Sequence, residues 1–181
     1  MITENTYRAI AASCQGAGIL ADLPGRLVPL WCDDYAFSNP RANIVEVETG
    51  TPGSAFTYLF DIQLERAIAA FGIPSTAKHA RDKSRLRGHP LAPNQGLNRG
   101  HLMAHSIGGE LDINLAPQAG KLNQGAFKRL EAEVLKLAQD HQQSFYFVRL
   151  VYNNSSQLPA YFEQGVIRTN GSINYALHRN V

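Results

Sequence analysis

The stretch that decides the fold reads Asn98-Arg99-Gly100-His101, then Asn114, then Leu122-Asn123-Gln124-Gly125, which opens a predicted helix carrying Leu130-Glu131. It gathers an arginine, an imidazole, a carboxamide and a carboxylate into about one supersecondary unit. We predict a strand, a loop and a helix that converge on one polar site and lie against an antiparallel sheet in an α+β domain.

Each residue of the Arg-Gly-His motif suits chemistry at a phosphate group. With an unperturbed pKa near ~6.5, a neutral imidazole at His101 can take a proton from water that attacks phosphorus. Arg99 supplies a planar, permanently charged fork for phosphate oxygens. Gly100 has no side chain, which leaves room for a phosphate or another backbone to come close. A surface loop with the same three residues is the structural alternative.

A second copy of the tripeptide, Arg87-Gly88-His89, shows that the tripeptide alone is weak evidence. The two copies differ in the residues on their C-terminal side. His89 precedes a Pro/Asn/Gly loop, so we interpret it as a loop histidine near the substrate. His101 precedes Asn114-Leu115-Ala116-Pro117-Gln118 and then the segment that starts at Leu122.

With these motifs, residues 98–131 resemble the DNA/RNA non-specific endonucleases of the ββα-metal, or His-Me finger, group. The signature of that group is Asp-Arg-Gly-His followed by an asparagine-bearing helix. The resemblance implies a ββα-metal core with an antiparallel sheet flanked by helices. It also implies hydrolysis of phosphodiester bonds in DNA and RNA with Mg²⁺ or Mn²⁺ as the cofactor.

The resemblance also assigns roles to individual residues. It makes His101 the general base and Arg99 the residue that contacts phosphate. Asn114 belongs to the catalytic group as a residue that supports the site. Asn123 is the single direct metal ligand, and Glu131 orients metal-bound water. On one continuous helix, Asn123 and Glu131 would be about 12 Å apart along the axis, so we expect only one of them to bind the ion directly.

Asn98 and His105 are expected to contact the residues that bind the metal and the substrate, without binding either themselves. Asn98 stands where the family usually has aspartate, which keeps a carbonyl oxygen but loses a negative charge. This change is expected to weaken metal affinity or to shift the pH optimum. His105 lies four residues after His101, but we expect an extended or irregular segment there, which disfavours a zinc site.

The basic residues are clustered although the overall charge is small. There are 17 Lys and Arg residues and 15 Asp and Glu residues, so the net charge of +2 does not by itself indicate nucleic-acid binding. The predicted nucleic-acid-binding cluster, opposed only by Asp82, is Lys78, Arg81, Lys83, Arg85 and Arg87, with Arg99 shortly after. It could neutralise several phosphates, and a solvated basic loop is the alternative.

Length and composition favour one globular domain. The chain has 181 residues, of which 44% are hydrophobic and 18% are charged. We divide the nuclease domain, residues 1–181, into an N-terminal portion (1–72), the basic loop with the motif and the metal-binding helix (73–142), and C-terminal antiparallel strands (143–181). Cys14 and Cys32 fit no metal-ligand spacing and are expected to be free thiols.

No apolar signal-peptide core occurs in the first thirty residues, and no run approaches the ~20 apolar residues of a membrane span. We therefore expect a chain that is made in the cytoplasm, without a signal peptide or a membrane segment. Compact members of the family resemble toxin modules at the ends of bacterial effector proteins. That resemblance implies delivery into target cells by a secretion system and an acidic immunity protein as a partner.

Apolar periodicity and turn residues predict the remaining elements. Helices are expected over 5–15, Ser54–Phe71 and Leu122–Gln142. Strands are expected over Leu27–Trp31, Asn43–Thr49, Phe145–Tyr152, Tyr161–Thr169 and Ile173–Leu177, the last three as an antiparallel meander. Residues 73–97 are expected to be irregular and partly extended.

Two other functions agree with the same residues. One is a nucleic-acid-binding module that has the fold but no catalytic activity, which Asn98 favours. The other is a structural or inhibitory protein that keeps the motif as a scaffold.

Overall fold

A six-stranded antiparallel sheet forms the centre of the computed structural model, which describes residues 2–14, 18–50, 55–76, 97–110 and 112–181. The strand order is β1-β2-β3-β6-β7-β8, and β4 and β5 form a separate two-stranded ribbon. The strands are β1 (Ile44–Thr49), β2 (Phe56–Asp61), β3 (Arg66–Gly72), β4 (Leu97–His101), β5 (Leu115–Ala119), β6 (Ser144–Val151), β7 (Tyr161–Arg168) and β8 (Ile173–Arg179).

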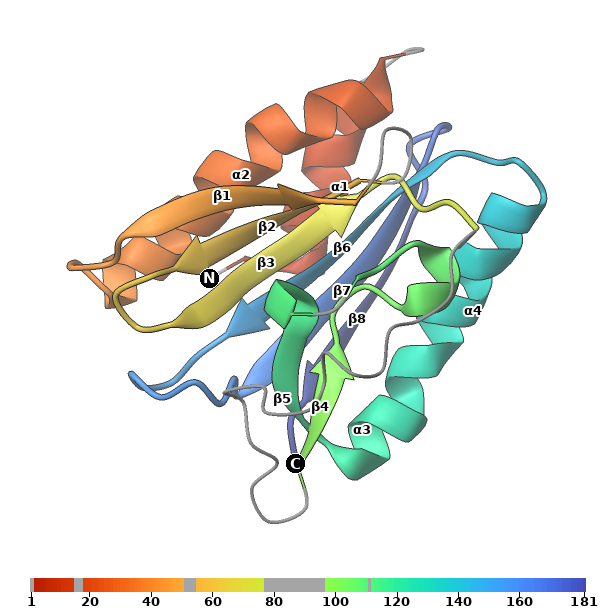
Figure 1. The fold of residues 1–181 in the computed structure, drawn as a ribbon. Coiled ribbons are helices and arrows are strands. Elements are labelled where there is room, and N and C mark those ends of the chain that lie inside the picture. The colour runs from red at the N-terminus through yellow and green to blue at the C-terminus, as the bar shows by residue number, and fades with distance from the viewer. Residues whose placement is uncertain (1, 15–17, 51–54, 77–96, 111) are drawn as a thin grey trace.

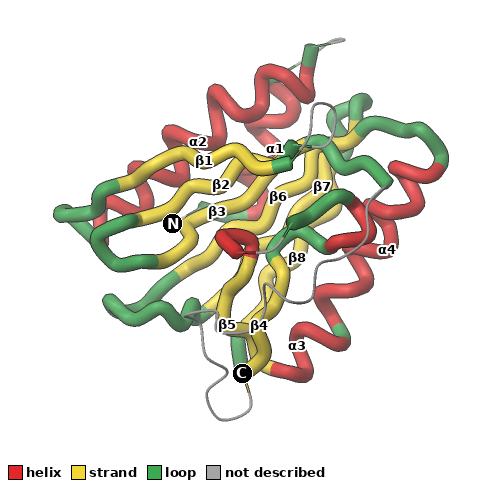
Figure 2. Tube along the Cα trace, in the orientation of Figure 1, coloured by secondary structure: helices red, strands yellow, loops and turns green. Residues whose placement is uncertain are grey.

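Helices cover both faces of the sheet, as Figures 1 and 2 show. Helices α1 (Glu4–Ser13) and α2 (Ile19–Ser38) lie on one face. The β4–β5 ribbon, α3 (Gly120–Gln124) and α4 (Ala126–Gln139) lie on the other. Each face has its own apolar core, so the sheet separates the N-terminal helices from the layer that carries the predicted site.

The prediction of a strand over Leu27–Trp31 is wrong, because these residues lie inside α2. The buried positions of that helix are Ile19, Leu20, Leu23, Leu27, Trp31 and Tyr35. Most are three or four residues apart, which is the spacing of one helix face. Pro24 and Pro29 lie inside the helix, and because proline is disfavoured there, they argue against a helix in the sequence. Packing of the apolar stripe on the sheet outweighs the local cost of the prolines.

The predicted helix over Ser54–Phe71 is also wrong, since the segment forms the hairpin of β2 and β3. Strand β3 is buried from Arg66 to Phe71, because it lies between β2 and β6 with layers on both faces. A strand buried on both faces loses the alternation of polar and apolar residues that normally identifies it. The turn is stabilised by Asp61, whose Oδ1 accepts a hydrogen bond from the Gln63 amide at 2.9 Å.

The other predicted elements are confirmed within a few residues. Helix α1, strand β1 and the meander β6-β7-β8 occur where the sequence predicts them. The helix expected over Leu122–Gln142 begins earlier, at Gly120, and Gly125 interrupts it between α3 and α4. Cys14 and Cys32 are free thiols, as expected.

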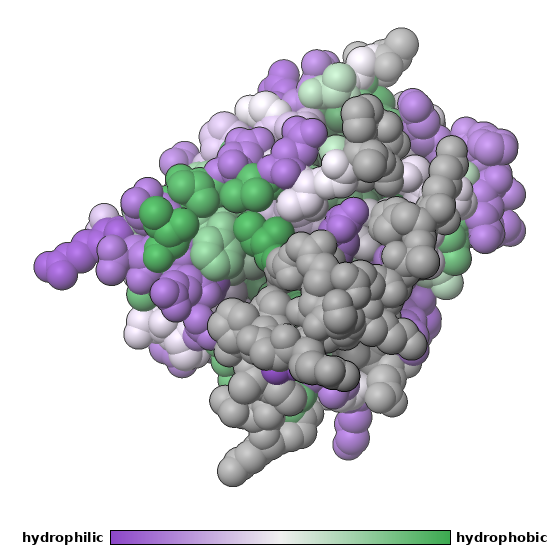
Figure 3. Space-filling view, viewed as in Figure 1, coloured by the Kyte–Doolittle hydropathy of each residue, from purple (hydrophilic) through white to green (hydrophobic). Residues whose placement is uncertain are grey.

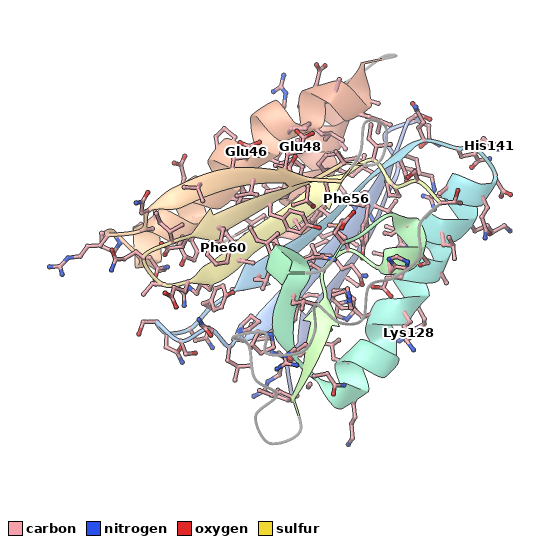
Figure 4. The ribbon with its side chains drawn as sticks, in the orientation of Figure 1. Glu46, Glu48, Phe56, Phe60, Lys128 and His141 are labelled. Carbon is pink, nitrogen blue, oxygen red and sulfur yellow. The ribbon has the colours of Figure 1, made fainter. Side chains whose placement is uncertain are left out.

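The surface in Figure 3 is mixed, with an apolar area on the viewer's side of β1–β3. Figure 4 shows Phe60 on this part of the sheet. Within the described ranges, none of the helices has the length and apolar character needed to span a bilayer.

Candidate active site

The Arg-Gly-His motif forms most of strand β4, which pairs with β5 in antiparallel register. Arg99 lies opposite Pro117, and His101 lies opposite Leu115. Because side chains alternate along a strand, Arg99 and His101 share one face of the ribbon, while Asn98 and Gly100 lie on the other. Asn98, Arg99 and His101 are all half-buried. The arginine and the predicted base therefore reach the same side, and the side chain of Asn98 lies on the opposite side of the ribbon.

Gly100 is required by a close approach within the ribbon. A Cβ atom at this position would lie 1.8 Å from Oε1 of Gln118 and 2.8 Å from its Cβ. Gln118 is fully buried, and neither polar atom of its carboxamide has a hydrogen-bond partner within the described chain. The glycine thus makes room for a buried carboxamide beside the motif.

Asn114 fastens the loop between β4 and β5. Its side chain is fully buried. Oδ1 accepts a hydrogen bond from the Met103 amide at 2.7 Å, and Nδ2 donates to the carbonyls of Met103 at 2.8 Å and Glu110 at 2.5 Å. Its own carbonyl accepts from the Leu102 amide at 2.9 Å. This geometry shows that Asn114 holds the turn after His101 in place.

The loop after His101 is tight, which the sequence did not reveal. Residues His105–Ile107 form a short 3-10 helix, η2, instead of the extended or irregular segment that we predicted. Gly108 comes next with φ +99°, a left-handed conformation that glycine adopts readily. The Nδ1 atom of His105 lies 3.4 Å from the Gly109 carbonyl oxygen. His105 therefore packs against its own loop.

The predicted metal-binding helix is two helices. Asn123 lies in α3 and Glu131 in α4, on opposite sides of the break at Gly125. The expected separation of about 12 Å assumed a continuous helix and does not apply. Helix α3 contacts both β4 and β5, so it borders the ribbon, and α4 contacts η2 in the loop that joins the two strands. The side chain of Asn123 lies outside the described part of the structure.

Glu131 has an unusual electrostatic environment. Burial raises the pKa of its carboxyl group from 4.5 to about 7, and the positive charge of Lys128 opposes this shift. Figure 4 shows Lys128 on α4, one turn before Glu131. The Glu131 carboxylate makes no hydrogen bond to another described residue. A partly buried carboxylate without a protein partner can hold a water molecule.

The predicted basic cluster of Lys78, Arg81, Lys83, Arg85 and Arg87 lies outside the described residues.

Three buried residues of this layer were missed by the sequence reasoning. Gln118 stands in the quoted motif but received no role. Gln164 and Asn180 come from distant parts of the chain. Asn180 accepts a hydrogen bond from the Ala119 amide at 2.8 Å and donates to the Pro117 carbonyl at 3.1 Å, so it joins the C-terminus to β5. The place of Gln164 beside Glu163, in a strand of otherwise mostly apolar residues, was the one signal available for it.

Comparison with known families decides the classification. The sequence matches the DNA/RNA non-specific endonuclease family over residues 62–167, which run from β3 through all but the last residue of β7 and include all of the predicted site. The chain belongs to this family. Membership supports an endonuclease function and a nucleic acid as the substrate. No curated protein matched the sequence.

Solved structures with the same fold are nucleases of low sequence identity. Magnesium-bound NucA from Streptococcus agalactiae is 16% identical, with a TM-score of 0.56 over 78% of this chain and 74% of NucA. The Sda1 nuclease with a bound zinc ion is 15% identical, with a TM-score of 0.54 over 76% of this chain and 84% of Sda1. At these identities the similarity shows the ββα-metal nuclease fold.

Proposed function

We propose that this protein is a divalent-ion-dependent endonuclease that hydrolyses phosphodiester bonds of DNA and RNA, with His101 as the general base. The observation that carries the proposal is the placement of Arg99 and His101 on one face of β4. Helix α3, which bears Asn123, contacts both strands of the ribbon, and α4, which bears Glu131, contacts η2 in the loop after His101. The Arg99 guanidinium, the His101 imidazole and the side-chain oxygens of Asn123 and Glu131 would thus act on one phosphodiester group.

His101 would accept the proton of the attacking water. A neutral imidazole suits this task, because its basicity is matched to a pH near neutrality. Arg99 would bind a non-bridging phosphate oxygen through its guanidinium group, which fixes the phosphorus in front of the base. Asn114 would hold the turn after His101 and so keep the imidazole in its orientation.

The residues at the site fit a hard divalent cation. Within the described ranges, no three His, Cys, Asp or Glu side chains gather into a metal-binding group. A centre based on the Asn123 carboxamide and on water needs no such group, and Mg²⁺ commonly keeps most of its waters. When bound, the ion would supply positive charge that stabilises the transition state and the departing oxygen. Glu131 would hold a water molecule by a hydrogen bond.

The magnesium in NucA and the zinc in Sda1 agree with a divalent ion. We choose magnesium, with manganese as a substitute, because the donors carry oxygen and lack sulfur.

A cleavage assay tests the proposal. Supercoiled plasmid and total RNA are incubated with protein in Mg²⁺, in Mn²⁺ and in EDTA. We expect cleavage with either ion, none in EDTA, and loss of cleavage in His101→Asn and Asn123→Ala. His141→Asn is the matched control, because it removes an exposed imidazole beyond the end of α4 (Figure 4). Asparagine also tolerates the φ of +56° at that position. Equal activity of His101→Asn and wild type would refute the proposed base.

The runner-up is a nucleic-acid-binding module without catalysis. Asn98, where the family usually carries aspartate, is the observation that favours it. In the same assay this alternative predicts retarded plasmid without nicks in either metal ion.

We also propose an antibacterial toxin role with an acidic immunity protein as the partner. This part rests on the resemblance to toxin modules of bacterial effectors. Expression of the wild type in the cytoplasm of a bacterial host should stop growth, whereas His101→Asn should not. Normal growth at matched expression of the active enzyme would refute the toxin role.

A further inference from the structure

A chain of buried hydrogen bonds lies beneath the helix that carries Glu131. Its centre is Gln164 of β7, which is fully buried. Gln164 Nε2 donates to the Phe127 carbonyl at 3.1 Å and to the Tyr146 hydroxyl at 2.7 Å. Its Oε1 lies 2.9 Å from Nε2 of His178 in β8. Both donor hydrogens of this carboxamide and its oxygen are therefore used by three partners.

The hydrogen-bond partners of Gln164 fix the orientation of its carboxamide and of the groups bonded to it. A carbonyl oxygen only accepts, so the Gln164 atom that faces Phe127 must be the NH₂ group. Oε1 then faces His178, whose Nε2 must carry the hydrogen. The Tyr146 hydroxyl receives a hydrogen bond from Gln164, and its own proton must point elsewhere. No described group accepts that proton within hydrogen-bond distance.

Both groups that accept hydrogen bonds from Gln164, the Phe127 carbonyl and the Tyr146 hydroxyl, interact in turn with Glu131. In an α-helix the carbonyl of residue i pairs with the amide of residue i+4, so the Phe127 carbonyl is the partner of the Glu131 amide. Gln164 therefore anchors to the sheet the turn of α4 that bears Glu131. Burial and, after it, the negative charge of Glu131 raise the pKa of the fully buried Tyr146 hydroxyl, so the carboxylate acts on this hydroxyl electrostatically.

We propose that Tyr146 and Gln164 are positioning residues for Glu131, with the Tyr146 proton donated toward the Glu131 carboxylate through a bridging water molecule. The inference rests on the proposed function, because it assigns the network a part in holding the carboxylate of the same active site. Glu131 has no hydrogen bond to another described residue, so such a water molecule would give it a defined direction.

The test compares two tyrosines that each lose only a hydroxyl group. Tyr146→Phe removes the proton that faces Glu131. Tyr152→Phe is the matched control, because the Tyr152 hydroxyl donates to the Ala67 carbonyl at 2.7 Å, away from α4. Both variants lose one hydrogen bond of a largely buried hydroxyl, so a purely structural role predicts similar effects. Gln164→Met is a second variant that keeps the size of the side chain and loses both donors.

We expect Tyr146→Phe and Gln164→Met to lower kcat about tenfold, the lower end of the effect of losing an outer-sphere partner, with KM nearly unchanged. Tyr152→Phe should keep the wild-type kcat. In Tyr146→Phe the acidic limb of the kcat/KM profile should also move to higher pH, because the Glu131 carboxylate loses a donor that favours its charged form. All measurements are made well below the melting temperature of the least stable variant.

The outcomes separate the two proposals. An active wild type with equal kcat in Tyr146→Phe and Tyr152→Phe would overturn the positioning role and leave the proposed function intact. An inactive wild type would overturn the proposed function and the positioning role together. If Gln164→Met does not fold, the comparison of the two tyrosine variants still decides.

Discussion

Gly100 shows how one missing side chain sets the geometry of the motif. The position is in contact with a buried carboxamide, so the glycine serves packing within the ribbon. The sequence suggested that a phosphate or another backbone comes close there. The packing reason became visible once Gln118 was found on the neighbouring strand, on the same face as Gly100.

Gly100→Ala should therefore destabilise the protein by about 1–3 kcal/mol, the usual cost of overpacking a core, and should lower activity by displacing His101. Gln118→Ala removes most of the obstructing atoms, so the double variant Gly100→Ala/Gln118→Ala should be less destabilised than the sum of the single changes. Urea unfolding of all four proteins gives the coupling energy. Strict additivity would show that the two residues do not compete for space.

Glu131 connects stability with function at a second residue. Burial raises the pKa of its carboxyl group from 4.5 to about 7, so the folded protein holds this proton more tightly than the unfolded chain does. The resulting stability is fully present below pH 4.5 and is lost as the pH rises through about 7. At alkaline pH the protein must keep a partly buried carboxylate charged.

Glu131→Gln should thus be more stable than the wild type at pH 8, by about 1–2 kcal/mol after allowance for solvent screening. The two proteins should be similarly stable near pH 4.5. The variant should also lose catalytic activity, because stabilising substitutions at functional sites commonly reduce activity. Urea unfolding at both pH values measures the difference. A variant that is less stable than the wild type at pH 8 would contradict the burial argument.

At the scale of elements, the sequence predicts best the elements that turn residues separate clearly. β7 and β8 were found from turn residues and apolar runs, although β7 is buried on both faces, and α1 was found from helical spacing. Helix α2 was missed because prolines inside it hide its apolar stripe. β3 was missed because it is buried throughout and its apolar residues, with those of β2, also fit a helical spacing. The motif residues could be found because their order is local. Gln118, Gln164 and Tyr146 could not be assigned, since their contacts join segments far apart in the chain.

The N-terminal helices are held to the sheet by a buried ion-pair network. Arg149 of β6 donates to Glu163 of β7 at 2.8 Å and also pairs with Asp34 of α2. The Tyr7 hydroxyl of α1 donates to the same Glu163 carboxylate at 2.5 Å. Because Arg149 and Glu163 are both buried, the loss of one partner would leave an uncompensated charge in the core.

Arg149→Leu should therefore cost about 3–5 kcal/mol of unfolding free energy. Arg168→Leu is the matched control, because Arg168 pairs with Glu133 at a partly exposed position and should cost at most ~1 kcal/mol. Arg149→Leu should keep the wild-type kcat at low temperature, since its network lies on the face of the sheet away from the candidate active site. Equal unfolding free energies for the two variants would contradict this role of the network in the N-terminal layer.

On the scale of the whole molecule, the sheet divides structural and chemical tasks. One face packs α1 and α2, which lie outside the family match at residues 62–167. The other face carries the ribbon, the turn held by Asn114, and α4 with Glu131. The network of Gln164 crosses from β8 to α4 within this second layer. The layer that carries His101 is thus built from three separate segments of the chain.

Chemical rescue is the sharpest test of whether the His101 imidazole is the general base. His101→Ala should lower the rate of oligonucleotide cleavage in Mg²⁺ by about 10²- to 10⁴-fold, the usual contribution of a general base. Imidazole added to the solution should restore part of that rate, in proportion to its unprotonated fraction, whereas Asn123→Ala should not respond. A folded His101→Ala protein that cleaves at the wild-type rate, or that gains nothing from imidazole, would contradict the assignment of His101 as the base.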